Sequence, residues 1–304
     1  MVRGFSAALL ALCLGTTALA DIGSGFNRYS VRVDDYTFQV RTYRPDCRDP
    51  DILFMHHGSS RNSNDYVAYP QELADRECFV VVAPLFNSTD FSNTEYQRAN
   101  LSGNANRPER WTTRYVPGLI AWAKRELGGD AAVIVSGHSA GGQFASRVAM
   151  DWPEGAELVV PMNPSTWFRA TLDERWPYGF GGAPNAEKRL REYLARPIVV
   201  YLGGADTSRD GNLASDAAAE RQGRNRLERG INTFNEAKRE AERRGWAFNW
   251  RLVIADGVGH SGNGMVDHPA ARDAFTVPAT RPDPEPEVRP QPEPDCMSGR
   301  VGAY

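Results

Sequence analysis

The chain has 304 residues, of which 41% are hydrophobic and 24% are charged, and its formal net charge is −3. This is the composition of a globular protein that is long enough for one large α/β domain. The small negative charge gives no electrostatic basis for binding nucleic acid or an anionic membrane surface.

The first twenty residues have the pattern of a secretory signal peptide. Arg3 supplies the positive end, residues 5–14 form an apolar stretch too short to span a bilayer, and Ala18-Leu19-Ala20 fits a cleavage site. We therefore expect a mature protein that begins at Asp21, is exported to the periplasm or beyond the cell, and keeps no stable membrane anchor.

Export also permits disulfide bonds. Cys47 comes just before one predicted strand and Cys78 just before the next, which would place both at one edge of a sheet. We expect a Cys47–Cys78 disulfide, and the alternative is a pair of buried free thiols. Cys296 lies in the C-terminal tail and has no predicted partner.

The predicted elements begin with a hairpin. Residues 29–43 alternate between apolar and polar around Asp34-Asp35, which indicates a β-hairpin or two edge strands. Short apolar runs typical of buried strands then alternate with stretches of helical spacing. The predicted strands are residues 51–55, 79–83, 133–135, 157–160, 198–202 and 247–254, and the predicted helices are residues 64–75, 111–127, 140–150, 217–244 and 265–275.

This alternation predicts a mostly parallel central sheet with helices on both faces. Three of the helices contain a proline, at Pro70, Pro117 and Pro269, and are expected to be irregular there.

Two segments depart from the alternation. Residues 87–110 are polar and predict a long loop, and residues 163–196 are rich in aromatic residues and glycine, which favours an excursion that walls a pocket. From residue 278, Pro, Glu, Asp and Arg dominate, which is typical of an extended or disordered tail. We thus expect one catalytic domain over residues 21–277 and a Pro-rich tail over residues 278–304.

The sequence Gly137-His138-Ser139-Ala140-Gly141 lies between a predicted buried strand and a predicted helix. A G-x-S-x-G pattern in this context indicates a nucleophile elbow, a turn so tight that the serine is strained and its neighbours must be glycine. Ser139 is then the candidate nucleophile, and the Ala140 N–H is a candidate oxyanion donor. The alternative is a glycine-rich phosphate-binding turn.

A serine nucleophile needs a base and a carboxylate that orients the base. In this type of fold the chain order is Ser, Asp or Glu, then His, and only His260 and His268 follow Ser139. His260 lies in a glycine-rich loop after the last strand, so we expect it to be the base. Asp206 directly follows a predicted strand and is the first candidate for the carboxylate, with Asp210 and Asp256 as alternatives.

The second oxyanion donor is expected in the loop after the strand at residues 51–55. The Ser59 N–H is the first candidate and the Gly58 N–H the alternative. His56 and His57 are expected to be structural, because neighbours on a strand point to opposite faces and make a poor metal site. The sequence predicts neither a metal ion nor a cofactor.

At these residues the chain resembles the α/β-hydrolase superfamily, and within it secreted esterases of the poly(3-hydroxybutyrate) depolymerase and feruloyl-esterase-like group. The resemblance lies in His57-Gly58, in residues 137–143, in residues 163–167, in residues 204–207 and in residues 258–261. It implies the α/β-hydrolase fold and a serine hydrolase that cleaves small or oligomeric carboxylic esters through an acyl-enzyme. The short tail, which replaces the binding modules that such depolymerases often append, argues against an insoluble polymer as substrate.

Trp167 follows a strand end and is a candidate for lining the acyl or alcohol pocket, although a buried packing role fits equally. The same triad would also serve a serine peptidase or an acyltransferase. A third interpretation is a hydrolase fold kept as a non-catalytic binding protein, but no member of the triad is missing from the sequence.

Overall fold

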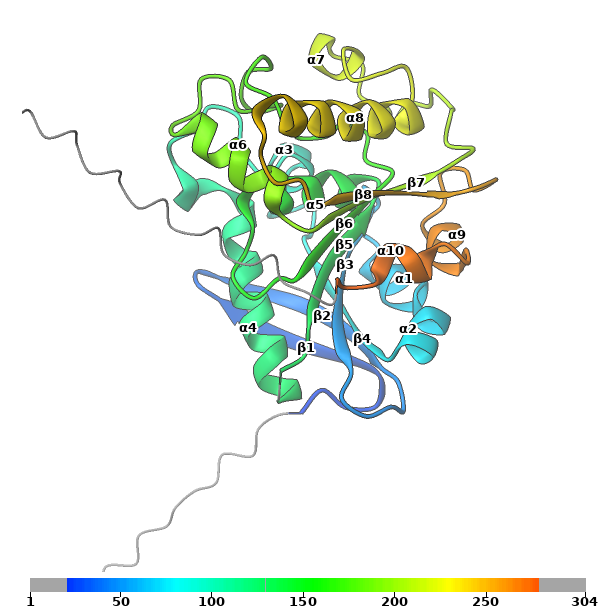
Figure 1. The fold of residues 1–304 in the computed structure, drawn as a ribbon. Coiled ribbons are helices and arrows are strands. Elements are labelled where there is room, and N and C mark those ends of the chain that lie inside the picture. Colours follow the sequence, from blue (N-terminus) through cyan, green and yellow to red (C-terminus); the bar gives the residue numbers. More distant parts are fainter. Residues whose placement is uncertain (1–20, 129, 279–304) are drawn as a thin grey trace, which may run out of the picture.

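The structure is a computed structural model that describes residues 21–128 and 130–278. Eight strands form one sheet in the order β1-β2-β4-β3-β5-β6-β7-β8 (Figure 1). The strands are β1 (Gly25–Val33), β2 (Tyr36–Arg44), β3 (Asp51–His56), β4 (Phe79–Leu85), β5 (Val133–His138), β6 (Leu158–Met162), β7 (Ile198–Gly203) and β8 (Trp250–Ala255).

The sheet is antiparallel at one edge and parallel elsewhere. β1 pairs antiparallel with β2, and β2 antiparallel with β4, whereas the remaining pairs from β4 through β8 are parallel. The predicted hairpin is confirmed, with Val33 opposite Tyr36 and Asp34 in the left-handed region of the turn at a φ of 49°. The prediction of a mostly parallel sheet is also confirmed. The predicted signal peptide, Cys296 and nearly all of the expected tail lie outside the described residues.

Helices cover both faces of the sheet (Figure 1). The helices are α1 (Ser63–Ala68), α2 (Gln71–Glu77), α3 (Asn93–Gln97), α4 (Tyr115–Leu127), α5 (Ala140–Asp151), α6 (Ala186–Ala195), α7 (Ala217–Glu220), α8 (Arg226–Arg244), α9 (Gly262–Asp267) and α10 (Ala271–Phe275). One hydrophobic core lies between the sheet and α4, α5, α6 and α8, and a second lies between the sheet and α1, α2, α9 and α10.

Several predicted helices are broken, each for a local reason. Pro70 separates α1 from α2, and Pro269 lies between α9 and α10, because proline lacks the N–H that would continue the helix. Pro117 instead falls in the first turn of α4, where that N–H has no intrahelical partner. The stretch 217–244 divides into α7 and α8 around Gly223, whose φ of 151° no helix contains.

The two segments predicted as irregular contain short helices. α3 lies within residues 87–110 and begins with a capping box in which Ser92 and Glu95 bond each other's backbone N–H. α6 lies within residues 163–196 and has few buried residues, Leu190, Tyr193 and Leu194. Its polar sequence explains why the apolar pattern did not reveal it.

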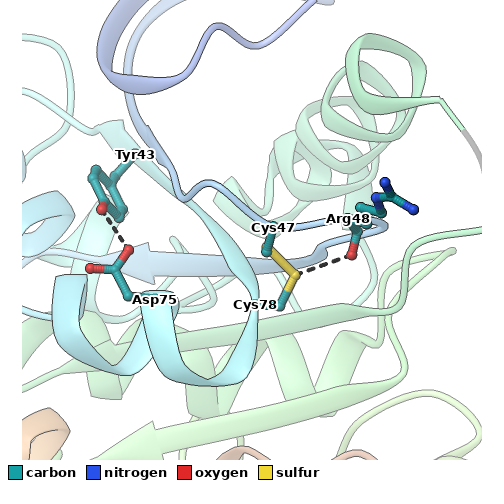
Figure 2. The surroundings of a disulfide bond; sticks show 5 residues. All are labelled: Tyr43, Cys47, Arg48, Asp75 and Cys78. Atoms are coloured by element: carbon teal, nitrogen blue, oxygen red, sulfur yellow. Dashed lines mark hydrogen bonds between the residues drawn. A yellow bond between two sulfur atoms is a disulfide. The ribbon is translucent and has the colours of Figure 1, made fainter.

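The Cys47–Cys78 disulfide predicted from the sequence is present (Figure 2), with the two Cα atoms 5.9 Å apart. It joins the chain just before β3 to the residue just before β4, two strands that pair in parallel. Nearby, Tyr43 donates a hydrogen bond of 2.6 Å to Asp75 and so ties β2 to α2.

Among the residues that the structure describes, none of the helices combines the length and the apolar character needed to cross a membrane.

Candidate active site

The turn between β5 and α5 holds Ser139 in a strained backbone conformation. Its φ is 57° and its ψ is −112°, which a residue with a Cβ adopts only when the surrounding structure enforces it. The Ser139 N–H donates to the Met162 carbonyl at 3.0 Å, and the Ser139 carbonyl accepts from the Gln143 N–H at 2.9 Å. These bonds fix the serine at the carboxyl edge of the parallel strands and at the N-terminus of α5.

Close backbone approach on both sides of Ser139 requires glycine. A Cβ on Gly141 would lie 2.0 Å from the carbonyl oxygen of His56, and one on Gly137 would lie 2.6 Å from the carbonyl oxygen of Gly141. Both distances are too short for any side chain. The glycines of the G-x-S-x-G pattern are therefore needed to pack β3, β5 and α5 together.

The structure brings Ser139, His260 and Asp206 into one hydrogen-bonded chain. His260 Nδ1 lies 2.7 Å from Asp206 Oδ2, and His260 Nε2 lies 3.0 Å from Ser139 Oγ. A carboxylate only accepts hydrogen bonds, so the imidazole proton is on Nδ1 and Nε2 is free to accept the serine proton. In this arrangement a serine hydroxyl, a base and an orienting carboxylate have the geometry required for nucleophilic attack.

The loops after β7 and β8 place the two partners of Ser139. Asp206 follows a turn in which its N–H donates to the Gly203 carbonyl, and the Ala205 N–H donates to the Val258 carbonyl in the His260 loop. The side chain of Asp206 is fully buried, whereas 21% of the His260 side chain is exposed. Asp206 and His260 thus come from neighbouring parallel strands whose loops are joined.

The alternatives for these roles lie elsewhere. Asp210 accepts two hydrogen bonds of 2.9 Å from the guanidinium of Arg226. Asp256 is exposed in the β8 loop, and His268 caps the end of α9. Of the candidate carboxylates, Asp206 is the one that contacts His260.

His138, the residue before Ser139, packs against the ring of His260 with the ring centroids 4.5 Å apart. The Asn163 amide donates to His138 Nε2 at 3.5 Å, so His138 Nδ1 carries the proton and donates to the Tyr66 hydroxyl at 3.1 Å. Burial lowers the pKa of His138 well below its usual value, and the ring is neutral. Sequence reasoning gave no role to His138, Asn163 or Tyr66, although His138 and Asn163 lie in segments that carry the family resemblance.

His57, the residue after β3, is hydrogen-bonded to the loop that follows this strand. His57 Nε2 accepts from the Phe86 N–H at 3.1 Å, so its Nδ1 carries the proton and donates to the Gly58 carbonyl at 3.0 Å. The hydroxyl of Tyr96 donates to the His57 carbonyl at 2.6 Å. Burial lowers the pKa of His57 to about 4, so its ring is neutral at pH 7, and both of its ring nitrogens hydrogen-bond to backbone groups.

Ser59 and Ala140 lie on the same cavity as Ser139. Neither the Ser59 N–H nor the Ala140 N–H donates a hydrogen bond to another described residue. Because an oxyanion hole needs backbone donors that are not used elsewhere, these two N–H groups remain the predicted pair.

The cavity has a volume of about 490 Å³ and opens beside Ser139. Its walls come from α3 with Arg98, from the start of α5, from Ser165, and from the loop of residues 211–215. Trp167 is not part of these walls. It is 1% exposed and packs in the core, with its backbone held by Gln222, so the expectation of a pocket-lining Trp167 is corrected to a packing role.

No protein-family model matches this chain, and a search of curated proteins finds no match either. Solved structures do match. The poly(3-hydroxybutyrate) depolymerase LpqC from Bordetella parapertussis is 31% identical with a TM-score of 0.75, and the alignment covers 82% of this chain and 90% of that one. The poly(aspartic acid) hydrolase-1 from Sphingomonas sp. KT-1 is 26% identical with a TM-score of 0.76, over 84% of this chain and 98% of that one.

A more distant match shows the fold alone. The S-formylglutathione hydrolase from Agrobacterium tumefaciens is 19% identical with a TM-score of 0.51, over 83% of this chain and 95% of that one. The resemblance to depolymerases stated from the motifs is confirmed by the first match. With its eight-stranded, mostly parallel sheet and this identity to the LpqC depolymerase, the chain belongs to the α/β-hydrolase family.

Proposed function

We propose that this protein is an exported serine hydrolase that cleaves carboxylic esters through an acyl-enzyme intermediate. The observation that carries the proposal is the hydrogen-bonded chain from Ser139 through His260 to Asp206, positioned at the mouth of a cavity. The identity to the LpqC depolymerase, an enzyme named for a polyester, supports the choice of an ester bond.

In the first half-reaction, Ser139 Oγ attacks the ester carbonyl carbon while its proton passes to His260 Nε2. The negative charge that develops on the carbonyl oxygen is stabilised by the N–H groups of Ala140 and Ser59. When the intermediate collapses, the alcohol leaves with the proton from His260, and the acyl group stays on Ser139.

Water completes the cycle by the reverse sequence of proton transfers. It gives a proton to His260 as it attacks the acyl carbon, and the acid leaves as Ser139 Oγ recovers that proton. Asp206 keeps the proton of His260 on Nδ1 throughout and stabilises the imidazolium that forms in each half-reaction.

Export and domain organisation form part of the proposal. The Cys47–Cys78 disulfide fits an oxidising compartment, in agreement with the signal-peptide pattern of the first twenty residues. The catalytic machinery described above, from the Ser59 loop to His260, falls within residues 21–277, which we propose to act as one catalytic unit.

Labelling with a fluorophosphonate probe tests the nucleophile. We expect the probe to attach to Ser139 in the wild type and in the variant Ser88→Ala, which removes an exposed serine outside the site, but not in Ser139→Ala. A folded wild type that remains unlabelled contradicts the proposal. For a 4-nitrophenyl ester, Asp206→Asn should lower kcat by about 10⁴ and Ser139→Ala by about 10⁶.

A second candidate is hydrolysis of an amide bond by the same triad. The observation that favours it is the match to an enzyme named for poly(aspartic acid), over 98% of that chain. Comparing 4-nitrophenyl butyrate with butyryl-4-nitroanilide separates the two functions, because both release a coloured product from the same acyl group. Adding methanol as acceptor reveals acyl transfer through faster release of 4-nitrophenol and the formation of methyl butyrate.

A further inference from the structure

The walls of the cavity beside Ser139 are polar and carry a positive charge. The polar residues that line it are Asn93, Thr94 and Gln97 of α3, together with Ser165, Asn212 and Ser215. Among the described residues that line it, Arg98 is the one charged group, and no carboxylate lies on the wall. Such a lining suits a ligand that accepts hydrogen bonds rather than a plain hydrocarbon chain.

Arg98 keeps most of its hydrogen-bonding capacity. Its Nη2 lies 3.3 Å from Asp216 Oδ2, and its guanidinium carbon lies 5.6 Å from the centre of the Tyr178 ring. Its Nε and Nη1 groups donate to no other described residue. About a third of the side chain, 35%, is exposed, and Arg98 is among the residues that line the cavity.

Asp216 is a shared partner rather than a dedicated one. Its Oδ2 also accepts from the Tyr178 hydroxyl at 2.9 Å, and its Oδ1 accepts from the Ala219 N–H at 3.1 Å to cap α7. Asp216 Oδ2 thus serves both Arg98 and Tyr178, and its contact with Arg98 joins side chains that are 35% and 43% exposed, so it is a weak, solvent-screened ion pair.

A second positive charge, on the buried Arg147, lies next to the cavity-lining residue Gln143. Arg147 is 1% exposed, and its Nη groups donate to the carbonyls of Gln143 and Thr166 and to the Thr166 hydroxyl, all of which are neutral. Burial lowers the pKa of Arg147 to about 10, which still leaves it protonated at neutral pH. Gln143 lines the cavity, so this uncompensated positive charge adds to the potential there.

We infer that the cavity binds a carboxylate carried by the substrate, and that Arg98 is the residue that pairs with it. A guanidinium with a free edge matches the two oxygens of a carboxylate in a bidentate pair, and the field of Arg147 favours a negative ligand. The inference rests on the proposed function, since the bond that is cleaved is the ester at Ser139. It specifies the substrate as an ester whose acyl or alcohol part ends in a free carboxylate.

A matched pair of substrates measures this preference. One is the 4-nitrophenyl monoester of adipic acid, which has a free carboxylate, and the other is its methyl ester, which has the same chain between its two carbonyl groups but no charge. We expect kcat/KM of the wild type to be at least about tenfold higher for the charged substrate, the gain of a charge-assisted hydrogen bond. The net charge of −3 acts against this preference, so overall attraction would not produce it.

Variants of the two charged partners should move the ratio of the two kcat/KM values in opposite directions. Arg98→Gln should lower the ratio at least about tenfold, and Arg98→Lys should restore part of it. Asp216→Asn removes the competing charge while it keeps a side chain able to cap α7, and it should raise the ratio. Arg107→Gln, which removes an exposed arginine outside the cavity wall, should leave the ratio unchanged.

Binding to the Ser139→Ala variant decides the inference independently of catalysis. Monomethyl adipate should bind more tightly than dimethyl adipate, and the additional change Arg98→Gln should abolish the difference. Equal binding of the two esters, or a wild-type preference that survives Arg98→Gln, overturns the inference while ester hydrolysis stands. If the wild type cleaves neither substrate, the proposed function fails, and the binding comparison still supports or overturns the carboxylate site.

Discussion

Arg226 lies beside the carboxylate of Asp206 with both side chains completely buried. Arg226 Nη1 is 3.7 Å from Asp206 Oδ1, and this oxygen has no hydrogen-bond partner among the described residues. The other oxygen accepts from His260. Arg226 also donates to both oxygens of Asp210 and holds the pKa of Asp210 well below its usual value. The negative charge of the buried Asp206 is thus offset by Arg226 beside Oδ1, while Oδ2 accepts the hydrogen bond from His260.

Replacement of Arg226 by methionine should lower activity through Asp206. A buried carboxylate that loses its countercharge costs about 3–5 kcal/mol, part of which we expect to appear as lost stability. Because each 1.4 kcal/mol of transition-state stabilisation is worth about tenfold in rate, kcat/KM on a neutral ester should fall at least about tenfold. Rates measured on variants that thermal melting shows to be folded test this.

Asp210→Asn is the control for that experiment. It removes the negative charge of Asp210 but leaves Arg226 beside Asp206, so we expect a much smaller loss of kcat/KM than in Arg226→Met. The loss in Arg226→Lys should lie between the two. Equal losses in Asp210→Asn and Arg226→Met would show that Arg226 matters only as a partner of Asp210.

The buried histidines at the end of β3, His56 and His57, should make the protein sensitive to acid. Burial lowers the pKa of His56 to about 3, against 6.5 in the unfolded chain. Between these pH values the unfolded state binds more protons than the folded state. The free energy of unfolding is therefore highest, as far as His56 is concerned, above about pH 6.5, and it falls as the pH drops below that value. Each such histidine contributes a slope of about 1.4 kcal/mol per pH unit in that window.

His56→Leu tests this because neither ring nitrogen of His56 has a hydrogen-bond partner among the described residues. The ring packs against Phe144 with centroids 4.8 Å apart, so an apolar side chain of similar size fits the same contact. We expect unchanged or higher stability at pH 7, since an unsatisfied polar group is removed, and a clear gain at pH 5. Urea unfolding at both pH values measures it, and an identical pH slope in both proteins would contradict the assignment.

The residues of the candidate site that follow strand ends could be predicted from the sequence, because strand positions and the order of residues along the chain are enough to locate them. Ser139, Asp206 and His260 each follow a strand of the parallel sheet, and the topology brings such residues to one edge. The hairpin, the elbow and the disulfide were predicted from alternation, glycine spacing and the positions of two cysteines.

Features that depend on packing between distant segments were not predictable in this way. Trp167 follows a strand end, as a pocket residue would, and only the tertiary structure shows it turned into the core. Arg226 begins a long polar helix in which many arginines look alike, and its burial depends on the turn that places α8 over the Asp206 loop. The same holds for Arg98 and Arg147. The sequence does not show that Arg98 shares Asp216 with Tyr178, or that Arg147 is buried among neutral acceptors.

A methyl group on Gly141 should prevent the elbow from forming. In Gly141→Ala the new Cβ would lie 2.0 Å from the His56 carbonyl oxygen, a backbone atom that has no room to move within β3. We expect either no soluble folded protein or a free energy of unfolding lower by at least about 3 kcal/mol. Gly259→Ala is the matched control, because open space surrounds that position, and chemical denaturation should find it within about 0.5 kcal/mol of the wild type.

Loss of the Cys47–Cys78 disulfide should destabilise the protein without changing the site. The bond joins residues separated by 31 positions, and closing a loop of this length is worth about 3–4 kcal/mol in the unfolded state. It lies before β3 and β4, at the end of the sheet opposite to Ser139, which follows the carboxyl end of β5. The double variant Cys47→Ala/Cys78→Ala should therefore unfold at lower denaturant concentration, yet keep the kcat/KM of the wild type for a neutral ester at 25 °C. Wild type that has been reduced should behave like the double variant, and unchanged stability in either sample would contradict a stabilising disulfide.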